Sequence, residues 1–191
     1  MAGQEFVFVG EALAFDFVNT EIAERRKAID LLRGPDDFSA WWGAAAERYA
    51  LPVTAGQAAR PSFERAKALR GALRRIFSAV VAEKSPDDAD MDTLNAVLAA
   101  GHTRLELMPG NRFGMQQVTD ADQALLLPIA HSAAWLLTEC EPERLHKCKN
   151  DWCVLMFLDT TKNGNRVWCS IDCMNRARSR ENYARKQHSE N

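Results

Sequence analysis

Two cysteine pairs in the last third of the chain decide its fold there: CKNDWC at residues 148–153 and CSIDC at residues 169–173. Fifteen residues separate the two pairs. A structural zinc site takes four soft ligands at the corners of a tetrahedron, and two close cysteine pairs supply them. The spacing therefore predicts one structural Zn²⁺ per chain. Its ligands would be Cys148, Cys153, Cys169 and Cys173.

Other uses of these cysteines are less consistent with the sequence. Two disulfides are disfavoured because the N-terminus is acidic and has no basic region typical of a signal peptide, so a cytoplasmic protein is expected. Four separate core thiols would not be expected to fall as two pairs within 26 residues. His146 could replace one sulfur ligand, whereas Cys140 is expected to be a buried thiol outside the site. A closed shell of four thiolates leaves no position for a catalytic water.

The residues around the cysteines predict a small treble-clef-like finger made of a knuckle, a β-hairpin and a helix. Within the spacer, 154–158 is expected to form one strand, 161–164 the turn and 165–168 the return strand. Ser170 is a suitable N-cap for the helix that follows, with Cys173 near its third position.

The predicted C-terminal helix is strongly basic. Residues 143–191 hold ten Lys and Arg against six Asp and Glu, whereas the preceding 142 residues hold fourteen against twenty. A basic helix on a zinc scaffold, with aromatic surfaces from Trp168 and Tyr183, favours binding to a phosphate backbone. DNA is the predicted partner, and RNA fits the same pattern. The predicted nucleic-acid-binding residues are Arg166, Asn175, Arg176, Arg178, Arg180, Arg185 and Lys186. The alternatives are a solvated basic face, a protein partner, or pairing with the acidic N-terminal part.

The finger sequence resembles a known family. It contains two cysteines followed by FLD at 157–159, RVWC at 166–169 and CMNR at 173–176. This pattern is similar to the CGNR zinc finger of bacterial proteins described as stress-induced transcription regulators. Met174 stands where that family has Gly. The four expected ligands match.

The N-terminal part, residues 1–142, is predicted to be mainly α-helical, with a small β-hairpin at 103–108 and 113–118. Apolar residues at helical spacing or helix-start signals predict five helices. These are expected at 11–20, from 35 onward, at 62–84, at 87–100, and at 120–140 with an interruption or kink at Pro128. The only predicted domain boundary lies at 141–143, which separates this body from the finger at 143–191. No apolar run approaches the roughly 20 residues that span a bilayer.

A second resemblance lies near the N-terminus. LAFDFVNT at residues 13–20 is similar to the motif that opens the alanine-rich ABATE domain, the usual companion of the CGNR finger. This resemblance implies a domain that senses a ligand or stress signal. Asp16, Asn19 and Thr20 would share one helix face. They could form a small ligand pocket, or they could end the helix, cap its neighbour and bind an arginine such as Arg25 or Arg26. Trp41 and Trp42 are expected in the core.

Catalytic motifs are missing from the sequence, since it contains neither a Gly-rich phosphate loop nor a His-Glu-x-x-His or Gly-x-Ser-x-Gly pattern. An enzyme is therefore not expected. The sequence predicts a zinc-binding transcription regulator that binds DNA through its finger and senses a signal or small ligand through its body. The alternatives are a protein-interaction module and a zinc–thiolate redox sensor. A homodimer would add base contacts to a single small finger, but no heptad pattern indicates one.

Overall fold

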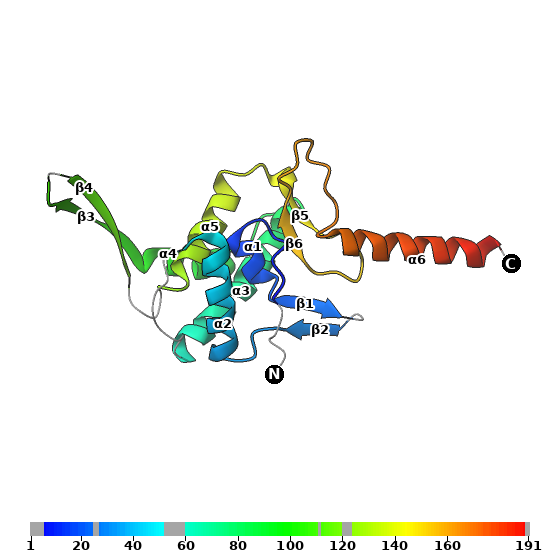
Figure 1. The fold of residues 1–191 in the computed structure, drawn as a ribbon, viewed down its shortest axis with the longest axis horizontal. Helices are drawn as coiled ribbons and strands as arrows, with labels where there is room; N and C mark the ends of the chain where they lie inside the picture. Colours follow the sequence, from blue (N-terminus) through cyan, green and yellow to red (C-terminus); the bar gives the residue numbers. More distant parts are fainter. Residues whose placement is uncertain (1–5, 25–26, 52–59, 111, 120–123, 190–191) are drawn as a thin grey trace.

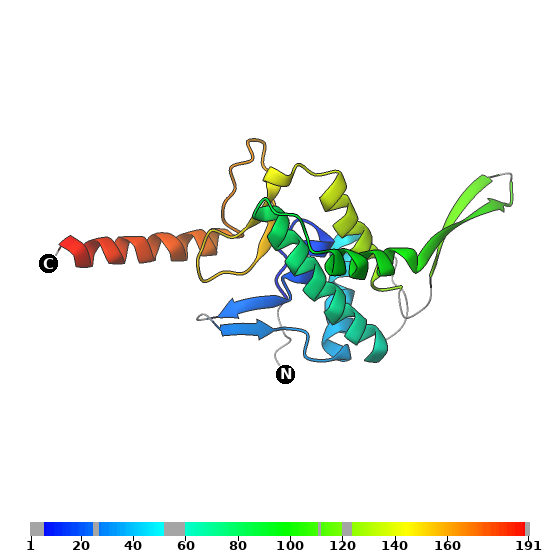
Figure 2. The same ribbon diagram turned by 180° about the vertical axis from the view of Figure 1, so that it is seen from behind.

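Helix α1 (Leu13–Val18) lies at the centre of the body in the computed structural model, which describes residues 6–24, 27–51, 60–110, 112–119 and 124–189. All six residues of α1 are buried. Around it the other helices of the body gather, while helix α6 projects to one side and the β3–β4 hairpin to the other (Figure 1). The view from behind shows the same two projections (Figure 2).

The body helices follow the expected pattern closely. They are α2 (Pro35–Tyr49), α3 (Arg60–Val81), α4 (Asp88–Ala99) and α5 (Leu127–Thr138). Pro35 stands in the first turn of α2, and Asp87 caps α4 by accepting the Ala89 N–H at 2.9 Å. Pro128 does not kink a longer helix, because the helix begins only at Leu127 and the proline occupies its first turn, where no N–H partner is needed.

Two hairpins belong to the body. The expected one is confirmed, as β3 (Gly101–Met108) pairs antiparallel with β4 (Arg112–Thr119). The other, β1 (Glu21–Glu24) with β2 (Lys27–Asp30), was not predicted, because its strands have only four residues each. It is held by Arg70, a side chain of α3 that is 1% exposed and donates to both carboxylate oxygens of Asp30 at 2.7 and 2.6 Å. Burial opposes the ionisation of Asp30, but the hydrogen bonds from Arg70 outweigh it and lower the pKa of that carboxyl.

The C-terminal part forms a hairpin, but not the predicted one. After a 3-10 turn at Pro142–Arg144, β5 (Leu145–Lys147) pairs antiparallel with β6 (Met156–Leu158), so the hairpin encloses the first cysteine pair. The expected return strand at 165–168 is wrong. There, the carboxylate of Asp159 accepts the backbone N–H groups of Thr161 at 2.8 Å and Arg166 at 2.7 Å. These bonds hold the loop without a strand partner. Helix α6 (Ile171–Ser189) follows.

The finger strands complete the hydrophobic core of the body. Leu145, Met156 and Leu158 belong to the same buried cluster as the apolar residues of α1, α2 and α3, including Trp41 and Trp42, which lie in the core as expected. A polar contact reinforces this packing. The Asn19 side chain donates to the Met156 carbonyl and accepts the Met156 N–H, both at 2.8 Å. The body and the finger are therefore joined through one continuous interior.

Candidate metal centre and nucleic-acid interface

The four paired cysteines come together in one cluster. Their sulfur atoms all lie within 4.8 Å of one another, with 3.4 Å between Cys148 and Cys173 and 3.7 Å between Cys153 and Cys169. Zinc–sulfur bonds of about 2.3 Å in a tetrahedron place the sulfurs about 3.8 Å apart. The cluster therefore fits a single tetrahedral cation. His146 lies outside it, with its ring centroid 5.5 Å from that of Phe157.

Each ligand comes from a different part of the finger. Cys148 follows β5 and begins the knuckle (residues 148–153), Cys153 ends the knuckle, and Cys169 lies in the loop before α6. Cys173 stands in the first turn of α6, where its N–H donates to the Ser170 hydroxyl at 3.1 Å, which confirms Ser170 as the N-cap. The cysteine cluster thus holds the start of the basic helix.

The pKa values of the clustered thiols favour a bound cation. Hydrogen bonds from the Cys153 and Cys169 thiols lower the pKa of Cys148. The same bonds raise the pKa of Cys153 to about 12 and raise that of Cys169 as well. The four clustered thiols therefore cannot all lose their protons together, because neighbouring thiolates repel one another. A divalent cation at their centre would replace these protons and allow all four sulfurs to ionise.

Asn150 connects this cluster to the basic helix. Its amide nitrogen donates to the Cys173 sulfur at 3.3 Å, and its amide oxygen accepts from Arg180 at 3.2 Å. The guanidinium of Arg180 also lies 3.7 Å from the ring centroid of Trp152. Arg180, a predicted phosphate contact, is thus engaged within the finger.

Arg166, a second predicted contact, is also engaged within the protein. It donates to the carbonyls of Cys169 at 2.7 Å and Val9 at 3.2 Å, and its guanidinium lies 4.4 Å from the ring centroid of Phe157. These contacts attach the loop of residues 159–170, which carries Cys169 and which we call the ligand loop, to the N-terminal segment. We therefore leave Arg166 out of the interface proposed below.

The remaining predicted contacts lie along α6. Asn175, Arg176, Arg178 and Arg185 are exposed, whereas the side chain of Lys186 lies outside the described part of the chain. Helical spacing places Arg178 and Arg185 on one flank and Arg176 on the opposite flank. Met174, where the family has Gly, is half-buried in this helix and has no positive φ, so a side chain fits there without backbone strain.

A groove that was not predicted lies between the knuckle and α6. Its volume is about 680 Å³. The lining residues are Lys149, Asn150, Asp151, Trp152, Trp168, Ala177, Ser179, Arg180 and Tyr183. The aromatic residues of this group are visible in the sequence, but only the folded finger shows that they line one space. We call it the knuckle groove.

Asp16, Asn19 and Thr20 each have partners inside the protein. Burial raises the pKa of Asp16 to about 6, although its carboxylate accepts from the Tyr49 hydroxyl at 2.5 Å and the Gly10 N–H at 2.6 Å. Thr20 accepts from Arg70 at 2.8 Å. The three side chains thus bond in different directions, with Asn19 bound to β6. A ligand pocket formed by them stays a prediction, and Arg25 and Arg26 lie outside the described residues.

These features define a helical protein with a C-terminal metal-binding finger. Two families match the sequence. The ABATE family, described as "Putative stress-induced transcription regulator", matches residues 11–139, and the CGNR zinc finger matches residues 144–186. The chain belongs to the ABATE family and carries a CGNR zinc finger, which confirms both resemblances.

Neither family description names an enzyme. A comparison with curated proteins finds no match. Among the helices that the structure describes, none is both long and apolar enough to cross a membrane.

Proposed function

We propose that this protein is a cytoplasmic transcription regulator whose finger holds one structural Zn²⁺ and binds DNA through α6. The observation that carries the proposal is the projection of α6 from the body (Figure 1), with its first turn held by the cysteine cluster and exposed arginines on opposite flanks. Four thiolates form a closed shell, so the metal would order the finger and take no part in catalysis.

The shape of α6 suits the major groove of a DNA duplex. Its 19 residues span about 28 Å at 1.5 Å per residue. The major groove, about 12 Å wide, admits one α-helix. A helix in that position faces a phosphate strand on each side, which matches Arg176 on one flank and Arg178 with Arg185 on the other. Asn175, near the start of the helix, is the candidate for a base contact.

Binding to random duplex DNA over a salt series tests this proposal. The test variant replaces Arg176, Arg178 and Arg185 with alanine. If each contacts one phosphate, the slope of log affinity against log salt falls by about 2.7, at about 0.9 per phosphate. A control variant replaces three exposed cations of the body with alanine and keeps the same net charge as the test variant. The control positions are Lys27, Arg65 and Lys84.

The control is expected to bind DNA as the wild type does. If the wild type fails to bind duplex DNA at low salt, or if both variants change the slope equally, DNA recognition by α6 is overturned. The finger would then be a protein-docking module. A preference for double-stranded RNA over DNA would also overturn the major-groove interface, because the major groove of A-form RNA is too narrow and deep for a helix.

The body would supply regulation. Because the body and the finger share one core, a small ligand or a second copy of the chain bound to the body could alter how α6 is presented. A redox role is less favoured, because Cys148, Cys169 and Cys173 are at most 5% exposed and metal ligation protects thiolates.

A further inference from the structure

We infer that the knuckle groove is a stacking site for an unpaired nucleobase, so that the finger binds single-stranded nucleic acid as well as the phosphates of a duplex. This inference rests on the proposed function, because the same chain must attract the phosphate backbone. It adds a second ligand class, a base that is free of its partner strand.

The first support is the aromatic lining. Trp152, Trp168 and Tyr183 face one groove from the knuckle, the ligand loop and α6. Trp152 is 39% exposed and Tyr183 is 66% exposed, so both rings are accessible to a ligand. Proteins that bind single strands stack successive bases on exposed aromatic rings, and each base strengthens binding by about 5- to 150-fold.

The second support is that the groove is built before any ligand arrives. The guanidinium of Arg180 stacks on the Trp152 ring at 3.7 Å, and Asn150 holds Arg180 while donating to a cysteine ligand. The knuckle wall and the helix wall are thus linked beside the cysteine cluster. The small residues Ala177 and Ser179 on the helix side leave room for a planar ring. The volume of about 680 Å³ lies within the usual range of small-molecule sites.

The third support is the charge around the groove. Lys149 is exposed at the groove, and Arg176 lies on the same flank of α6 as Tyr183, two turns earlier. Both cations could contact phosphates next to a stacked base. Asp151 is the only acidic residue among those that line the groove. Aromatic faces with neighbouring cations match a nucleotide, which carries both a planar base and a negatively charged phosphate. They match a ligand that is only acidic or only apolar less well.

The test compares three labelled probes by fluorescence anisotropy with the full-length, metal-loaded protein. The probes are a 12-nucleotide oligo-dT, an abasic strand with the same backbone, and a random duplex. The wild type is expected to bind oligo-dT at least fivefold more tightly than the abasic strand. An oligo-U strand of equal length distinguishes RNA from DNA as the source of the base.

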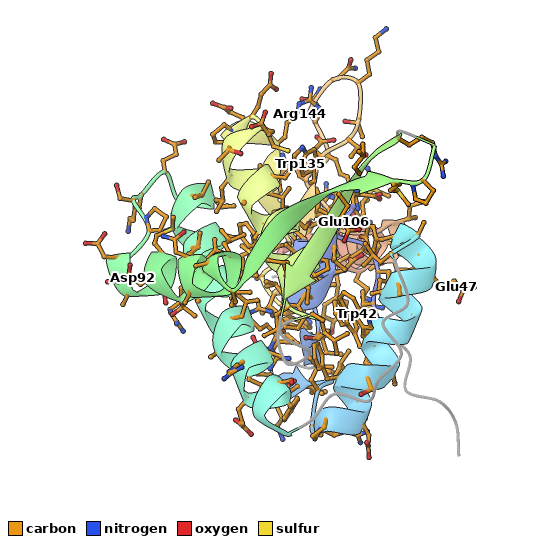
Figure 3. All side chains as sticks on the ribbon, turned by 90° about the vertical axis from the view of Figure 1, so that its left-hand side faces the viewer. Trp42, Glu47, Asp92, Glu106, Trp135 and Arg144 are labelled. Atoms are coloured by element: carbon orange, nitrogen blue, oxygen red, sulfur yellow. The ribbon has the colours of Figure 1, made fainter. Side chains whose placement is uncertain are left out.

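Two variants test the groove itself. Trp152→Leu and Tyr183→Leu are each expected to reduce the preference for oligo-dT over the abasic strand to less than twofold and to leave duplex binding unchanged. Tyr183 is highly exposed, so its variant should fold even if the Trp152 variant does not. The control is Trp135→Leu on α5, since Trp135 is 47% exposed and lies on the body, which Figure 3 shows from the side opposite α6. This control should keep the full preference.

Equal binding of oligo-dT and the abasic strand by the wild type would overturn the stacking site, as would a preference that survives in both groove variants. If the duplex then still binds with the expected salt dependence, only this inference fails. If oligo-dT binds through the groove and the duplex does not bind, the stacking site holds and the proposed duplex interface fails.

Discussion

Replacing Asn19 with alanine would test how strongly the body and the finger are joined. The Asn19 side chain is fully buried, and its amide makes two 2.8 Å hydrogen bonds to the backbone of Met156, which is itself 1% exposed. Alanine would leave the N–H and the carbonyl of Met156 buried without these partners. Each such group costs about 1–3 kcal/mol, so the loss of both partners should lower the free energy of unfolding by about 2–6 kcal/mol.

The assay is urea unfolding of the metal-loaded protein, followed by circular dichroism and tryptophan fluorescence. The matched control is Asn95→Ala, at an exposed position of α4, which should change the free energy of unfolding by no more than about 0.5 kcal/mol. If Asn19→Ala costs less than about 1 kcal/mol with an unchanged urea dependence, the two bonds do not stabilise the junction, and the reasoning is refuted.

Three further predictions concern the metal, pH and the groove wall. Removing the metal with a chelator should lower the melting temperature of the body as well as that of the finger, because both share one core. The measurement is thermal unfolding followed by near-ultraviolet circular dichroism, and an unchanged melting temperature of the body would contradict the prediction. Between about pH 4 and pH 6 the free energy of unfolding should fall by about 3 kcal/mol as pH rises, because the folded state keeps the Asp16 proton that the unfolded state has lost. Asp16→Asn should remove this component, and equal pH dependence of both proteins in urea unfolding would count against it. Asn150→Ala should weaken metal binding about tenfold or more in competition with a chromophoric chelator, whereas Asn163→Ala, in the exposed spacer, should bind like the wild type.

The parts of the fold that depend on neighbouring residues could be predicted from the sequence. Asp87 and Ser170 cap helices because their side chains reach N–H groups two or three residues away. The long helix α3 follows from apolar residues at helical spacing. The spacing of the cysteines likewise indicated a four-sulfur cluster, because two close pairs supply a tetrahedral set.

The tertiary structure decided which distant groups meet. The sequence by itself determined that the finger contains a hairpin, a helix and four clustered sulfurs. It did not determine that β6 pairs with β5, that Asn19 binds Met156 from 137 residues away, or that Arg166 is engaged by carbonyls instead of facing solvent. The physical reason is that a backbone N–H, a carbonyl or a guanidinium has many partners of similar energy. Only the packing of the core selects among them.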